Sequence, residues 1–156
     1  MPRPRKPATP AEALVGVAPL AARWIERLLA SGEPPLTLAQ YLALRAIASE
    51  PLAATELARR AGVSGAAVSQ LVRALESAGW VEREPEPADR RRHLLTLTPV
   101  GFEAFQSATR RVYEGLGEVL ADLPPHEARA LTDLLVTLEH VLAGAPPPRR
   151  RPPPRP

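Results

Sequence analysis

The chain has 156 residues, a length typical of one domain with short extensions, and 45% of them are hydrophobic, enough for a buried core. It contains no cysteine, which excludes disulfide scaffolds, thiolate zinc sites and thiol redox chemistry. The whole chain has a net charge of +3, but residues 11–144 carry 13 basic and 17 acidic residues, a net charge of −4. The basic charge therefore lies at the two ends, and it does not by itself indicate that the folded body binds nucleic acid.

Both ends are rich in proline and arginine. Residues 1–10 and 145–156 hold 11 of the 20 prolines, which predicts a disordered basic arm and a disordered Pro/Arg tail with at most nonspecific phosphate affinity. The basic start resembles a secretory signal, but Pro19 interrupts the apolar run and the helical pattern continues past it. Since no apolar run reaches the roughly 18 residues of a membrane span, the sequence predicts a soluble, cytoplasmic protein without a membrane partner.

Apolar residues recur at helical spacing along most of the remaining chain. Thr37 and Ser64 are suited to cap two of the helices, while Ser31-Gly32 and Pro51 end two others. The predicted helices cover residues 11–30, 37–48, 54–60, 64–78 and 102–122, and a last helix follows Pro125 and runs to about residue 142.

A short helix, a glycine turn and a longer helix follow one another in residues 54–78. Small Ala58 would let the two helices approach, Gly62 would take the sharp turn, and Val63 would fill the junction. The longer helix has its inward residues at positions i, i+3, i+4 and i+7; these are Val68, Leu71, Val72 and Leu75. The pattern predicts a helix-turn-helix, although many helical proteins contain such a corner.

A β-hairpin is predicted directly after this unit. Residues 81–84 alternate at period two, Pro85 and Pro87 are expected to end the strand, and residues 93–98 read as its partner. The loop between them, residues 88–92, contains three arginines. A hairpin in this place is a wing, and arginines at its tip suit phosphates and a narrow minor groove.

The stretch LARRAGVSGAAVSQLVRALESAGW at residues 57–80 and the stretch DRRRHLLTLTPVG at residues 89–101 resemble the MarR (multiple antibiotic resistance regulator) family. The Asp-x-Arg of the second stretch, followed by Leu-Thr and a glycine, is the more specific half. The resemblance implies a mainly α fold with a small β-hairpin wing, forming one winged-helix domain over residues 11–144. It places the winged core at about 36–100 and dimerisation helices at about 11–30 and 101–142.

By this resemblance, residues 64–78 form the recognition helix. Arg73 and Gln70 have the hydrogen-bonding groups for bidentate contacts to guanine and adenine. Arg91 matches the wing residue that enters the minor groove, Asp89 would orient an arginine, and Arg59 and Arg60 would flank the DNA backbone. The expected DNA-binding residues are Ser64, Gly65, Ala66, Ser69, Gln70, Arg73, Arg90, Arg91 and Arg92.

The resemblance further implies a homodimeric transcriptional repressor that binds an inverted repeat in double-stranded DNA. It also implies a small aromatic or anionic effector, for which Trp24, Tyr41 and Arg45 are the candidate pocket residues. The alternative is a helical interaction protein without a regulatory role, whose arginine-rich tails bind nucleic acid or acidic partners nonspecifically. A ligand-binding protein that has lost DNA binding is a third option, since the recognition helix is only weakly basic.

The sequence gives little support to an enzyme. Residues 62–66 come within one residue of a nucleophile-elbow motif, but a helix precedes the serine where that motif needs a strand. Phosphate-cradling, dinucleotide-binding and zinc-protease motifs are absent. We therefore expect no catalytic residues, no cofactor and no metal; a metal site using His126, Glu127 or His140 is the less favoured alternative.

Overall fold

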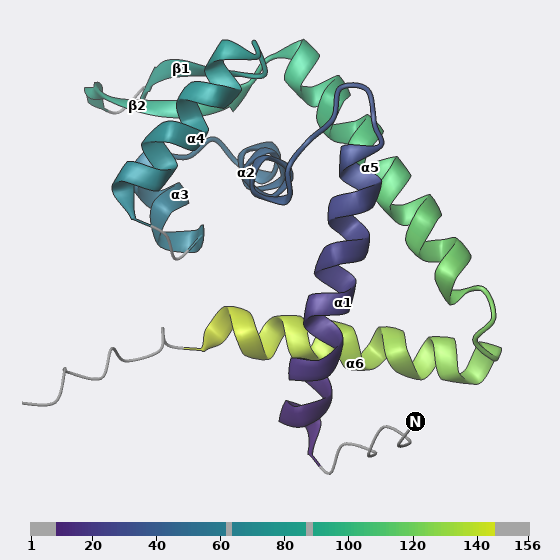
Figure 1. Ribbon diagram of the computed structural model, residues 1–156. Coiled ribbons are helices and arrows are strands. Elements are labelled where there is room, and N and C mark those ends of the chain that lie inside the picture. The colour runs from purple at the N-terminus through teal and green to yellow at the C-terminus, as the bar shows by residue number, and fades with distance from the viewer. Residues whose placement is uncertain (1–8, 62–63, 87–88, 146–156) are drawn as a thin grey trace, which may run out of the picture. The chain divides into compact units, whose positions relative to one another are not determined.

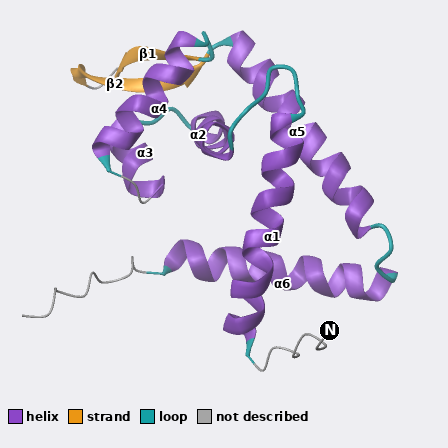
Figure 2. Cartoon of the chain, in the orientation of Figure 1, coloured by secondary structure: helices purple, strands orange, loops and turns teal. Residues whose placement is uncertain are grey.

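The computed structural model describes residues 9–61, 64–86 and 89–145. The predicted arm up to residue 8, the turn residues Gly62 and Val63, and the tail from residue 146 lie outside these ranges, as do Pro87, Ala88 and the side chains of Arg90 and Arg91. The elements in chain order are α1 (Pro10–Ala30), α2 (Leu38–Ser49), α3 (Ala54–Ala61), α4 (Gly65–Ser77), β1 (Val81–Glu86), β2 (Asp89–Leu97), α5 (Pro99–Leu120) and α6 (Pro125–Gly144). The prediction of a mainly α fold with one β-hairpin is confirmed (Figure 2).

Local hydrogen bonds explain where several helices begin. The Thr37 side chain accepts a hydrogen bond from the Gln40 backbone N–H at 3.2 Å, and the Gln40 side chain accepts one from the Thr37 backbone N–H at 2.8 Å, a capping box. Ser64 Oγ accepts from the Ala67 N–H at 3.3 Å. Both predicted caps are therefore confirmed. Thr9 caps α1 in the same way, through the Glu12 N–H.

The core surrounds α2, which contacts α1, α4 and β2 (Figure 1). Leu44 on α2, Leu29 on α1 and Leu75 on α4 are completely buried. The segment after α2 is also tied to the hairpin, because Leu52 and Leu95 exchange two backbone hydrogen bonds of 3.4 and 2.9 Å. This bridge fixes the hairpin against the helix-turn-helix, and nothing in the local sequence pattern indicated it.

The hairpin is longer than predicted. β1 continues through Pro85, which pairs with His93, to Glu86, and β2 already begins at Asp89. The expectation that Pro85 ends the strand was wrong, because a proline is tolerated where the ladder needs no N–H from it, as in this two-stranded sheet with a register irregularity after Pro85. Consequently the backbone of Arg90, Arg91 and Arg92 belongs to β2 and not to a loop.

α5 begins at Pro99, three residues before the predicted start at Phe102. Proline is well suited to the first turn of a helix because its missing N–H has no partner there anyway. The Thr98 side chain accepts a hydrogen bond from the Gly101 N–H at 3.0 Å and donates one to the Gly79 carbonyl at 2.6 Å. Thr98 thus joins the end of the hairpin to the end of α4 and to the start of α5.

The chain divides into two compact units, residues up to Gly117 and residues from Glu118 onward. The first unit contains α1 to β2 and most of α5, and it holds the buried core. The second contains the end of α5 and all of α6, which has no buried residue in this single chain. Among the described helices, none is both long and apolar enough to cross a membrane.

Candidate nucleic-acid interface

The helix predicted to be the recognition helix, α4, has one buried and one exposed face. Val68, Val72 and Leu75 are at most 2% exposed and anchor the helix on the core. The residues predicted to face a DNA major groove all lie on the exposed side; these are Gly65, Ala66, Ser69, Gln70 and Arg73. Because the buried face fixes the rotation of the helix, the polar side chains are presented to solvent as a set.

The exposed face of α4 offers a mixture of hydrogen-bonding groups. Ser69 Oγ donates to the Gly65 carbonyl at 2.8 Å, which leaves its lone pairs as acceptors. Gln70 has an amide donor and acceptor, and Arg73 has a guanidinium fork. These are the groups that read base edges in a major groove, so the arrangement suits direct readout of duplex DNA.

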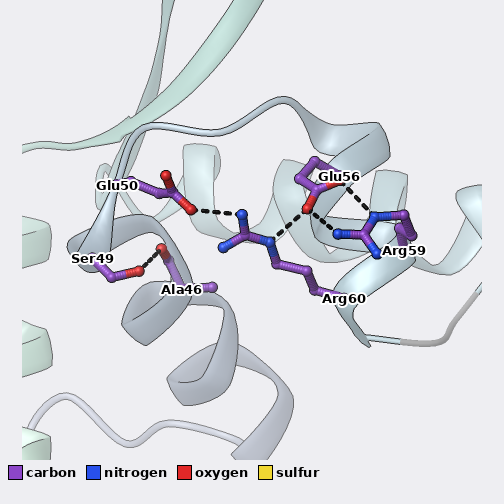
Figure 3. A network of polar contacts seen from close by, with 6 residues as sticks. All are labelled: Ala46, Ser49, Glu50, Glu56, Arg59 and Arg60. Atoms are coloured by element: carbon purple, nitrogen blue, oxygen red, sulfur yellow. Dashed lines mark hydrogen bonds and ion pairs between the residues drawn. The ribbon is translucent and has the colours of Figure 1, made fainter. Parts of the chain in front are cut away.

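Arg59 and Arg60 on α3 are the residues predicted to flank the DNA backbone. Both form ion pairs with acidic side chains (Figure 3). Glu56 accepts two hydrogen bonds from Arg59, at 2.8 and 2.6 Å, and one from Arg60 at 2.7 Å. Arg60 also donates to Glu50 at 2.6 Å. Figure 3 shows Glu56 between the two arginines and Arg60 between the two glutamates. Two arginines and two glutamates therefore cancel one another's charge at this end of α3.

The hydrogen bonds of this network shift the pKa values of Glu56, Arg59 and Arg60. Hydrogen bonds from Arg59 and then Arg60 lower the pKa of Glu56 to about 2. The hydrogen bond to Glu56 raises the pKa of Arg59, and those to Glu56 and Glu50 raise the pKa of Arg60. Glu56 thus stays ionised at all physiological pH values, and a DNA phosphate would have to compete with it for both arginines.

Two further ion pairs involve the hairpin, one to α4 and one between its own strands. Arg83 on β1 donates to Glu76 on α4 at 2.7 Å, and Arg92 Nη1 on β2 lies 3.3 Å from Glu86 Oε2. Both pairs are partly exposed, so their contribution to stability is small. Their consequence is geometric, because Arg83 holds the base of the wing beside the recognition helix.

The hairpin that carries the wing arginines follows α4 in the chain, and its first strand, β1, contacts α4. Asp89 is exposed and begins β2. Of the three arginines that follow it, the structure describes the side chain of Arg92, which is exposed. The assigned DNA contacts of Arg90, Arg91 and Arg92, and the orienting role of Asp89, stay predictions.

Sequence reasoning missed the acidic partners of the arginines. The spacing of Glu56 to Arg59 and Arg60, i to i+3 and i+4 in a helix, was a usable signal for ion pairing. Glu50 and Arg60 are ten positions apart, and Glu76 and Arg83 are seven apart across a turn, so only the folded chain reveals these pairs.

The three predicted effector-pocket residues have different surroundings. Tyr41 is 6% exposed, with its ring centroid 5.8 Å from that of Phe105. Trp24 is 41% exposed and carries the Arg27 guanidinium over its ring, 4.5 Å from the centroid. Arg45 is exposed on α2. The effector role of these residues stays a prediction.

In the described part of the chain, no group of three or more His, Asp or Glu side chains lies close enough to hold a metal ion. The exposed His126 and Glu127 and the more distant His140 all lie on α6.

The comparison with known proteins agrees with this geometry. A sequence model described as the MarR family matches residues 35–92, which span α2 to the start of β2. A helix-turn-helix transcriptional regulator of Mycobacterium bovis is 32% identical over 108 residues, which cover 67% of this chain and 76% of that protein. The chain belongs to the MarR family of transcriptional regulators.

Other resemblances extend over different shares of the chain. The Bacillus subtilis regulator YdgJ is 29% identical over 92 residues, and the match spans 56% of that protein's length, little more than half. A crystal structure of a Mycobacterium tuberculosis MarR-family protein in complex with salicylic acid is 29% identical. It superposes with a TM-score of 0.70 over 85% of this chain and 98% of that one. The structural likeness therefore extends beyond the segment that the family model matches.

Proposed function

We propose that this MarR-family protein is a sequence-specific regulator that binds double-stranded DNA in the cytoplasm, as a dimeric repressor of an inverted-repeat operator. The observation that carries the proposal is the recognition helix α4, on which Ser69, Gln70 and Arg73 are exposed; Val68, Val72 and Leu75 of the same helix are buried, and Leu71 is partly buried. An adjacent hairpin rich in arginine supplies the second DNA contact. Base contacts from α4 would specify the sequence, and phosphate contacts would position the protein.

The test is selection of bound fragments from random and genomic DNA by the purified protein at about 0.15 M salt, where nonspecific phosphate binding is weakened. We expect an enriched inverted repeat with half-sites about one helical turn apart, the spacing that two recognition helices related by a two-fold axis require. Arg73→Ala should then reduce the preference for the selected site about 5- to 150-fold, the range for losing a bidentate base contact.

Truncation of residues 145–156 is the matched control for this experiment. The tail should contribute only nonspecific phosphate affinity, so its removal should weaken binding to all sequences by a similar factor. If truncation abolishes binding while Arg73→Ala has no effect, the function resides in the tail, as expected of a non-regulatory interaction protein.

The dimer is part of the proposal because the apolar surface of the described helices is too large for a single chain. The side chains concerned are more than 40% exposed and lie on α1, the end of α5 and α6; they are Val15, Val17, Leu20, Trp24, Val119, Leu120, Leu134, Leu135, Val136, Val141 and Leu142. Soluble monomers rarely expose large apolar patches, and such patches often mark sites of association. A second copy of the chain would cover it.

Leu134→Asp tests the dimer directly. Leu134 is 68% exposed in the single chain, so a charge there costs little in a monomer but is costly when buried between copies. We expect the wild-type protein to sediment at twice the chain mass and Leu134→Asp to dissociate at micromolar concentration. Thr132→Asp, which adds the same charge at another exposed position of α6, should leave the mass unchanged if the apolar face is the interface.

The effector part of the proposal is supported by the relative that binds salicylic acid. A small aromatic or anionic compound would relieve repression if it binds the DNA-incompetent conformation more tightly than the DNA-competent one. Salicylate is the first compound to add to the operator-binding assay. Trp24, Tyr41 and Arg45 are the residues to substitute in order to test whether they bind it.

A further inference from the structure

The four-residue network on α3 and the end of α2 occupies both arginines of α3 with carboxylates. Arg59 and Glu56 form a bidentate pair, and Arg60 is shared between Glu56 and Glu50. The pairs are accessible, since the Arg59 side chain is 73% exposed and the Arg60 side chain is 39% exposed. They therefore add little to stability, and burial does not explain why both arginines are neutralised.

The position of α3 gives these pairs a consequence for DNA binding. In a helix-turn-helix, the first helix crosses the DNA backbone while the second enters the major groove. α3 is that first helix, so Arg59 and Arg60 lie on the element that approaches phosphates. The Glu56 carboxylate already accepts hydrogen bonds from both guanidinium groups, and it is negatively charged like a phosphate. It would therefore weaken the attraction between either arginine and a DNA phosphate.

We propose that Glu56 is a positioning residue that restrains nonspecific DNA binding by keeping Arg59 and Arg60 paired. It thereby increases the preference for the operator over other DNA sequences. The inference rests on the proposed DNA-binding function. Nonspecific complexes depend almost entirely on phosphate contacts and adopt whichever orientation gives the most of them. In the operator complex, the base contacts of α4 dictate where α3 lies, so free arginines on α3 would strengthen nonspecific complexes more than the specific one.

The main test compares wild type with Glu56→Gln, which keeps the shape of the side chain and removes its charge. Affinity for the selected operator and for a scrambled duplex is measured from 0.05 to 0.2 M KCl. We expect tighter binding to the scrambled duplex and a smaller operator preference. Each added phosphate contact steepens the salt dependence by about 0.9 in log–log slope, which is about a 3.5-fold greater loss of affinity over this range.

Two controls separate the restraint from a general effect of charge. Glu114→Gln removes one negative charge from an exposed position on α5 and should leave the slope unchanged. In a chain carrying Arg59→Ala and Arg60→Ala, Glu56→Gln should have no further effect, because the arginines through which Glu56 acts are gone. A gain in nonspecific affinity that persists without the arginines, or that Glu114→Gln reproduces, overturns the proposal.

A third comparison does not require Glu56 to be changed. If both arginines are already held by acids, Arg59→Ala with Arg60→Ala should alter the nonspecific slope little in the otherwise wild-type chain. A slope reduced by about 1.8 would mean that both arginines contact phosphates freely, and the proposal would be wrong. Failure of the wild type to prefer any operator would instead refute the proposed function, while the scrambled-duplex measurements would still decide the role of Glu56.

Discussion

Leu75→Ala is expected to lower the free energy of unfolding by about 3–5 kcal/mol, the range for removing a fully buried leucine side chain. Leu75 has no exposed surface, and its carbonyl accepts a hydrogen bond from the Trp80 N–H at 3.0 Å, where the chain leaves α4 for the hairpin. For a domain of ordinary stability, a loss of this size is a large share of the total.

The measurement is urea unfolding followed by far-UV circular dichroism at a fixed protein concentration. Leu42→Ala on α2 is the matched control, because Leu42 is 49% exposed and loses the same atoms from a site that is half in water. The control should cost about 1 kcal/mol, in proportion to the smaller apolar area removed from burial. Equal losses in the two variants would show that α4 is not anchored through Leu75.

The sequence was sufficient for the features that depend on neighbouring residues. Thr37 and Ser64 cap their helices through residues three positions away, and the buried face of α4 follows from a repeat of apolar residues along one helix. The exposed positions of Gln70 and Arg73 follow from the same repeat, since they lie on the opposite side. The helical part of the candidate site could therefore be predicted with the correct orientation.

The features that the sequence did not predict arise from contacts between distant residues. Pro85 could be a strand residue only because of how β1 pairs with β2, and the Leu52–Leu95 bridge joins segments more than forty positions apart. The pairing of Arg60 with Glu50 requires the end of α2 to lie beside α3. For this reason the pairing of Arg60 with Glu50 was not predicted, although both charged residues were visible in the sequence.

Gly101→Ala is expected to destabilise the protein by about 1–3 kcal/mol or more, although alanine is the better helix former. A Cβ at Gly101 would overlap the Trp80 carbonyl oxygen, and the next nearest atoms are also Trp80 backbone. A flexible side chain could rotate away, whereas this backbone is held by the Thr98 N–H, which donates to the Trp80 carbonyl at 3.1 Å. The start of α5 would have to move away from the end of α4.

Gly117→Ala is the matched control on the same helix, because apart from its chain neighbours and the backbone of its own helix, no atom lies within 4 Å of the Cβ that it would add. At position 117 only the higher helix propensity of alanine acts, so the free energy of unfolding should increase by up to about 1 kcal/mol. Opposite signs for the two substitutions in urea unfolding would assign the cost at position 101 to the close approach of α5 and Trp80. If Gly101→Ala is as stable as Gly117→Ala, the α5 start is not held by this contact. In that case the Thr98 hydrogen bonds to Gly79 and Gly101 would be what keeps the wing in place beside the recognition helix.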